Sequence, residues 1–178
     1  MPTIDTSYFF GDLKIAQISQ PEVAASLNAA IEKKEDELLN RLLGYSLFKD
    51  YKAGIIASTQ IYKDIRDGKE YTDLNGQLTK WVGLAFTSGI IKRSLIANYV
   101  YYHYLKDNDS FTTGSSEKKT GLAINVSPEK KMNDGWNEMV KGNIALNEFL
   151  VMNVQLYPQY AFVIQDKELF TFKNYLGI

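Results

Sequence analysis

Apolar residues recur at helical spacing in the first third of the chain, after a stretch that shows no such period. Residues 1–18 are therefore expected to form an extended N-terminal arm. A helix is predicted from Ser19, because Ser19-Gln20-Pro21-Glu22 has the spacing of a capping box. Gly44 is expected to end this helix. Its apolar stripe consists of Val23, Leu27, Ile31, Leu38, Leu42 and Leu43.

The following segment, residues 45–68, leaves two structures open. A second helix through Ile61 and Ile65, ended by Asp67-Gly68, is preferred. A strand over 60–66 is the alternative, because a short apolar segment does not distinguish the two periods. Asn75-Gly76 then predicts a β-hairpin over 70–82, since these residues accept the positive φ angles of a type I′ turn.

Two more helices are predicted in the second half. The run from Leu84 to Leu105 is apolar over most of its circumference, which is typical of a helix buried in its bundle or by a partner. Residues 107–126 are polar and are expected to form a long loop. Ser127-Pro128 begins the last helix, which continues to about Leu156 and has Gly142 as a candidate kink.

The tail, residues 159–178, changes character again and has the pattern of strand, turn and strand. An exposed apolar β-arm favours pairing, so this one is expected to pair with another chain or to fold back over the bundle. The whole chain is thus predicted to be a single, mainly α domain. It would be a bundle of three to four helices over 19–156, with an inserted β-hairpin and a C-terminal β-arm.

Composition excludes several classes of protein. The 178 residues are 45% hydrophobic, enough for the core of one domain. The chain has no cysteine, which rules out disulfides, zinc–thiolate sites, iron–sulfur clusters and thiol nucleophiles. Its 20 basic and 21 acidic residues give a net charge of −1, which argues against a protein that mainly grips phosphate backbone. No signal peptide and no membrane span are expected.

No side chain forms a persuasive catalytic or cofactor site. The single histidine, His103, lies among tyrosines and is expected to pack in an aromatic ridge. Residues 114–120 lack the spacing of a phosphate-binding loop, and residues 107–118 lack the glycine and glutamate of a calcium loop. The carboxylates of residues 35–37 and 64–73 are expected to be solvated, with no shift in pKa. We therefore expect no metal, no cofactor and no catalytic residues.

The order of these elements resembles the head–tail connector (adaptor) proteins of tailed bacteriophages, in a version typical of phages and prophages of Bacteroidetes. The likeness covers roughly residues 20–156. It is carried by the helix end Leu42-Leu43-Gly44-Tyr45, by Trp81-Val82-Gly83-Leu84, by the tyrosine-rich stretch 92–102 and by Thr112-Thr113-Gly114.

The resemblance implies a structural role in the virion neck, with assembly in the host cytoplasm. Such connectors form a ring, usually twelvefold, below the portal and extend the DNA channel. The implied partners are other copies of the chain, the portal, the next neck or tail protein and, without specificity, genomic DNA; no membrane is implied. A stopper or tail-completion protein of the same neck, or a non-viral assembly module, is the alternative.

The interface residues are expected in the arm and in the long loop. The arm would dock on a neighbouring subunit or on the portal by β-augmentation. Its docking residues would be Phe162, Val163, Leu169, Phe170 and Phe172. The loop over 108–121 is expected to become ordered only in the assembly, with Phe111, Thr113, Lys118 and Lys119 as contacts. The twelve tyrosines fit either a contact surface or a tyrosine-rich core.

Overall fold

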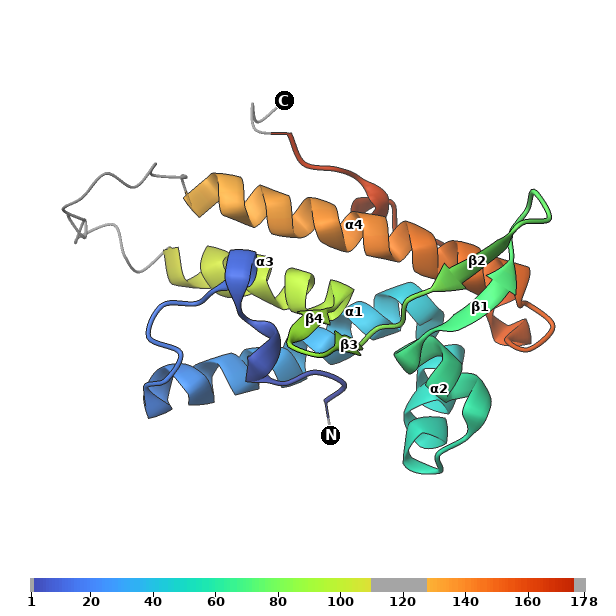
Figure 1. Ribbon diagram of the computed structural model, residues 1–178, viewed down its shortest axis with the longest axis horizontal. Helices are drawn as coiled ribbons and strands as arrows, with labels where there is room; N and C mark the ends of the chain where they lie inside the picture. Colours follow the sequence, from blue (N-terminus) through green and yellow to red (C-terminus); the bar gives the residue numbers. More distant parts are fainter. Residues whose placement is uncertain (1, 110–127, 175–178) are drawn as a thin grey trace.

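The computed structural model describes residues 2–109 and 128–174 (Figure 1). The described residues form four α-helices and two small antiparallel hairpins, so the predicted mainly α bundle with an inserted hairpin is confirmed. The helices are α1 (Pro21–Ile56), α2 (Gln60–Asp67), α3 (Leu95–Asp109) and α4 (Pro128–Met152). The strands are β1 (Lys69–Thr72), β2 (Leu78–Trp81), β3 (Phe86–Ser88) and β4 (Ile91–Arg93).

Helix α1 buries the predicted stripe but starts differently from the prediction. Pro21 occupies the first helical position, where its missing N–H is not needed. Gln20 is the N-cap residue and makes no side-chain capping bond, so the capping box predicted at Ser19 is not formed. The buried members of the stripe are Leu27, Ile31, Leu38, Leu42 and Leu43, joined by Leu39.

Gly44 bends α1 instead of ending it, which corrects the prediction. Its backbone leaves the helical region, with φ 70° and ψ 157°, and the helix resumes to Ile56 in a new direction. Few residues other than glycine adopt this conformation. Helix α2 follows after a short turn and ends at Gly68, whose φ is 95°. The preferred reading of residues 60–67 as helix is thereby confirmed.

The predicted hairpin is present, but its turn is of another type. Strands β1 and β2 pair with Thr72 opposite Leu78. The Asp73 N–H bonds the Gln77 carbonyl at 2.9 Å, and Gly76 has a φ of 78°. This is a three-residue loop with a glycine bulge and not a two-residue type I′ turn. Asp73 Oδ1 stabilises it by accepting the N–H groups of Asn75 and Gln77 at 2.9 and 2.8 Å.

The first part of the predicted helix 84–105 is a second hairpin. Strands β3 and β4 are joined at Gly89-Ile90, where Gly89 has a φ of 59° in the first central position of the turn. That position suits glycine in a type II′ turn. Helix α3 starts only after Ser94, whose Oγ accepts the N–H of Ile96 at 3.1 Å. A favourable cap and a positive-φ glycine together outweigh the helical period of this segment.

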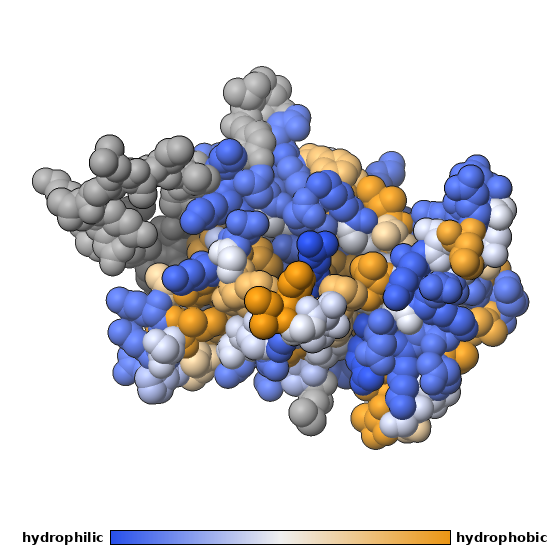
Figure 2. Space-filling view, in the orientation of Figure 1, coloured by the Kyte–Doolittle hydropathy of each residue, from blue (hydrophilic) through white to orange (hydrophobic). Residues whose placement is uncertain are grey.

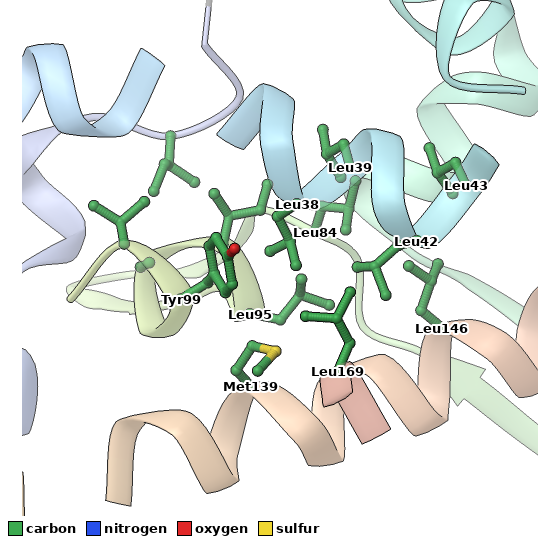
Figure 3. Packing of buried hydrophobic residues seen from close by; sticks show 14 of the residues in the cluster. Leu38, Leu39, Leu42, Leu43, Leu84, Leu95, Tyr99, Met139, Leu146 and Leu169 are labelled. Atoms are coloured by element: carbon green, nitrogen blue, oxygen red, sulfur yellow. The ribbon is translucent and has the colours of Figure 1, made fainter. Parts of the chain in front are cut away.

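Helices α3 and α4 run antiparallel (Figure 1), and the core lies between them and α1, with α3 packed against both of the other helices (Figure 3). Helix α4 runs through Gly142 without the expected kink. A Cβ at Gly142 would lie 2.8 Å from Leu95 Cβ, so this glycine allows α3 and α4 to approach closely. Side chains from all three helices meet in this core, and they include Leu38, Leu42, Leu95, Tyr99, Met139 and Leu146.

The N-terminal arm is folded against the bundle, although it was expected to be extended. It contains two short 3-10 helices, η1 (Thr6–Tyr8) and η2 (Gly11–Leu13), and η2 contacts α3. Figure 1 shows the arm crossing the helices. Its buried apolar residues are Ile4, Tyr8, Phe9 and Ile15. The arm is therefore part of the hydrophobic core.

The C-terminal segment contains no strand among residues 158–174, so the predicted strand–turn–strand arm is wrong. It forms two 3-10 helices, η3 (Pro158–Phe162) and η4 (Lys167–Phe170), and folds back along α1 and α4. Side chains of α4 take the place of a partner strand. Asn143 Nδ2 donates to the Leu169 carbonyl at 2.8 Å, and Trp136 Nε1 donates to the Thr171 carbonyl at 2.9 Å.

Candidate functional site

The five predicted interface residues that the structure describes fall into three groups. Leu169 is fully buried in the hydrophobic core of the chain. Val163 and Phe170 are half-buried against that core, whereas Phe162 and Phe172 are exposed. The structure thus leaves part of the predicted set accessible to a partner. The other four predicted contacts, Phe111, Thr113, Lys118 and Lys119, lie outside the described residues.

We call residues 163–173 the strap, and Arg41 of α1 is its main ionic anchor. The Arg41 guanidinium bonds Asp166 Oδ2 at 2.9 Å through Nε and at 2.7 Å through Nη2. Nη2 also bonds Glu168 Oε2 at 2.7 Å. Burial disfavours the charge on Arg41, but its bonds to Glu168 and Asp166 outweigh burial and raise its pKa. The charged form of Arg41 therefore fixes the strap on α1.

Near Arg41, the strap meets the bend of α1. Val163 packs on Gly44 so closely that a Cβ on this glycine would lie 2.9 Å from Val163 Cγ2. The residues on either side of this contact point away from the core. Phe162 and Ile164 expose 87% and 93% of their surface, and Tyr45 is also exposed. We call Tyr45, Phe162 and Ile164 the kink patch.

The end of the strap is held by a polar side chain of α4 and by an aromatic pair, Trp136 of α4 and Tyr102 of α3. The Lys173 N–H donates to Asn137 Oδ1 at 2.7 Å, and Asn137 Nδ2 donates back to the Lys173 carbonyl at 3.0 Å. The Lys173 ammonium lies 4.4 Å from the ring centre of Trp136 and 4.9 Å from that of Tyr102. Such cation–π contacts are favourable. The strap is therefore attached at both ends and through Leu169 in the middle.

The aromatic ridge predicted around His103 is confirmed. Its ring centre lies 4.4 Å from that of Tyr99 and 5.2 Å from that of Tyr102. Burial, helped by the positive charge of Lys34, lowers the His103 pKa to about 4. Nε2 is buried and has no hydrogen-bond partner. His103 is therefore a neutral packing residue at neutral pH.

Glu35 corrects the expectation that its carboxylate cluster is solvated with ordinary pKa values. Its side chain is buried, and the Thr3 N–H donates to both carboxylate oxygens, at 2.7 and 2.9 Å. Burial raises the pKa of Glu35, although the bonds from Thr3 oppose the rise. Helical spacing places position 35 on the apolar stripe between Ile31 and Leu38, but no local pattern predicts the hydrogen bonds from Thr3, because they come from the N-terminal arm.

Two further exposed apolar places lie on the hairpins. Leu74 and Leu78 are exposed on the β1–β2 hairpin, and Ile90 exposes 93% of its surface at the β3–β4 turn. Figure 2 shows hydrophobic side chains on one face of the molecule. Ile90 lies within the segment 84–105 that was predicted to be a buried helix, so the helical period does not reveal it as a surface residue. The Gly89 turn signal was the available clue.

Two hollows in the described surface are smaller than typical ligand pockets. They have volumes of about 200 and 180 Å³, and charged residues line both. Typical ligand pockets measure roughly 300–1,000 Å³. Among residues 2–109 and 128–174, no group of three or more acidic, histidine or cysteine side chains is placed to bind a metal ion. No helix in this part of the chain is long and apolar enough to cross a bilayer.

Comparisons of the chain with protein-family models, with curated proteins and with solved structures found no match. Its function is therefore inferred from the sequence pattern and from the surfaces described above.

Proposed function

We propose that the chain is a subunit of the head–tail connector of a tailed bacteriophage. In this proposal, copies of the chain form a ring below the portal that extends the DNA channel and joins capsid to tail. The proposal starts from the order of helices and hairpin in the sequence. One structural observation supports it further: large exposed apolar side chains stand at several separate places on different elements, and the kink patch, the β1–β2 hairpin and the β3–β4 turn are three of them.

Three separate apolar places suit a ring subunit better than a simple dimer. A twofold dimer uses one self-complementary patch on both subunits, whereas a ring subunit presents two different faces to its two neighbours. The kink patch, the β1–β2 hairpin and the β3–β4 turn supply enough distinct surfaces for two neighbours and one further partner. We assign that further partner to the portal or to the next neck or tail protein.

The charge of the chain is compatible with the wall of a DNA channel. Its net charge of −1 provides no strong attraction that would hold DNA in place. A hydrolase based on His103 is less favoured, because its pKa of about 4 is far from neutral and Nε2 has no partner. A structural role therefore accounts for more of the described features.

Electron microscopy of the purified full chain, combined with two surface variants, tests this proposal. We expect closed rings of uniform diameter for the wild type. Ile90→Asp and Leu78→Asp should keep the helical circular dichroism of the wild type and lose the rings, since a charge in an apolar contact is costly. Lys141→Asp, an exposed change on α4, is the matched control and should form rings. Rings that persist in both apolar variants would refute these contacts.

A further inference from the structure

We propose that the strap is an exchangeable element: in the assembly it leaves its own subunit and occupies the same groove on the next copy of the chain. The inference rests on the proposed self-assembly and names the occupant of one of its interfaces. The groove is the surface that the strap covers in the monomer. It is formed by Arg41 and Gly44 of α1 and by Trp136, Asn137 and Asn143 of α4.

The groove recognises this particular segment. Arg41 requires acidic side chains at the positions of Asp166 and Glu168. Asn143 and Trp136 require backbone carbonyls at Leu169 and Thr171, with the Leu169 side chain buried between them. A second copy of the chain supplies the same set of groups. Exchange of an identical element is a low-cost route to an oligomer, because every contact is reproduced.

The closed monomer leaves polar groups unsatisfied under the strap. Asn143 is fully buried, and its Oδ1 has no hydrogen-bond partner. Gln165 Oε1, on the strap itself, is also buried without a partner. Among the described residues, His103 Nε2 is the only other buried side-chain atom without a hydrogen-bond partner. Buried polar atoms without partners weaken the contact that buries them, so the strap is held less tightly in the groove and is released more easily.

The chain before the strap is fixed, which defines a hinge. The Tyr157 hydroxyl donates to the Ile61 carbonyl at 2.7 Å, and the Tyr160 hydroxyl donates to Asn147 Oδ1 at 2.8 Å. Phe162 and Ile164 follow and are almost fully exposed. In extended form, ten residues span roughly 33 Å. A strap that swings out after Tyr160 can therefore reach a neighbouring subunit, and the kink patch would be covered there.

Charge reversal in two full-length variants tests the exchange. Arg41→Asp has a reversed groove with a wild-type strap. Asp166→Arg/Glu168→Arg has a wild-type groove with a reversed strap. Neither variant can satisfy its own groove with its own strap or with that of an identical copy. In an alternating mixture, each groove meets a complementary strap only if straps are exchanged between subunits.

We expect each variant alone to lose at least tenfold in the amount assembled, and the equimolar mixture to regain wild-type assembly by light scattering. The single chain that carries all three substitutions should assemble alone and is the control for folding. If this control assembles and the mixture remains as poor as its components, the exchange is refuted and self-assembly stands. If the wild type itself does not assemble, the proposed function fails with it.

A disulfide provides a second test, since the chain has no cysteine of its own. A Cβ on Gly44 would lie 3.7 Å from Val163 Cβ, within the range of about 3.5–4.5 Å that a disulfide requires. We would oxidise assembled Gly44→Cys/Val163→Cys and run it on a non-reducing gel. Exchange predicts a ladder of covalent multimers. A single band at the monomer position, obtained from an assembled sample, would overturn the exchange.

Discussion

Val163 of the strap packs directly on Gly44, the residue at which α1 changes direction. The contact joins the bend of the first helix to the end of the chain. The space beside Gly44 is filled by a valine side chain, and the backbone there has a conformation that suits only glycine. The bend and the position of the strap therefore depend on each other.

Gly44→Ala should destabilise the protein by about 1–3 kcal/mol, because alanine is strained at a φ of 70° and its Cβ contacts Val163. Urea unfolding followed by circular dichroism measures the change. Val163→Ala in the same chain removes the steric contact and leaves the backbone strain. The double variant should therefore stay less stable than Val163→Ala alone. Equal stability of these two proteins would show that strain at Gly44 is not important.

Leu169→Ala should lower the free energy of unfolding by about 2–5 kcal/mol, because this side chain is fully buried among α1, α3 and α4. Phe172→Ala is the matched control on the same segment. Phe172 is exposed on one side, so its loss should cost less than about 1 kcal/mol. The two urea midpoints check the order. A Leu169→Ala protein as stable as the Phe172→Ala protein would mean that the segment is not docked in solution.

His103 should make the protein less stable in mild acid. Its pKa is lowered from 6.5 to about 4 in the fold, so between these values the unfolded chain binds more protons than the folded one. Stability is therefore lost as pH falls through this window, by about 2 kcal/mol once solvent screening of the partly exposed ring is allowed for. His103→Phe should remove this part of the pH dependence in urea titrations from pH 7 to 4. An unchanged profile would contradict the burial of the neutral ring.

Glu35 should act in the opposite direction. Its pKa is raised by burial, so from its ordinary value of 4.5 upward the folded chain binds more protons than the unfolded one. The contribution of Glu35 to stability is therefore complete below pH 4.5 and declines as pH rises. We would compare two proteins that both carry His103→Phe, one with Glu35 and one with Glu35→Gln. The Glu35→Gln protein should become more stable relative to the other as the pH rises from 4. A difference between the two that does not vary with pH would contradict this assignment.

Helical periodicity predicted the cores of α1, α3 and α4, because their apolar stripes face a common centre. The same criterion failed at residues 84–94, where a hydrophobic run has a helical period but forms β3 and β4. Gly89 with its positive φ, and Ser94 as a helix cap, decide the structure there. At Gly44, local signals gave the right position for a break but not the continuation of the helix beyond it.

The predictions about the candidate site that were wrong concern residues whose contacts come from distant parts of the sequence. Residues 162–164, where the strap begins, have the alternation of a strand, with Phe162 out, Val163 in and Ile164 out. The partners of the strap are nevertheless side chains of α4 and not a strand. Glu35 is buried by Thr3, which lies 32 residues earlier in the chain. No local pattern contains either contact. The aromatic setting of His103, in contrast, comes partly from neighbours on its own helix and was predicted.

Light scattering behind size-exclusion chromatography, over a concentration series of the full chain, tests the proposed assembly most directly. We expect a closed oligomer, with one discrete mass that is a fixed multiple of the 20.2 kDa subunit and does not grow further with concentration. A mass of one subunit at every concentration would contradict the proposal, and so would open-ended growth without a limiting size.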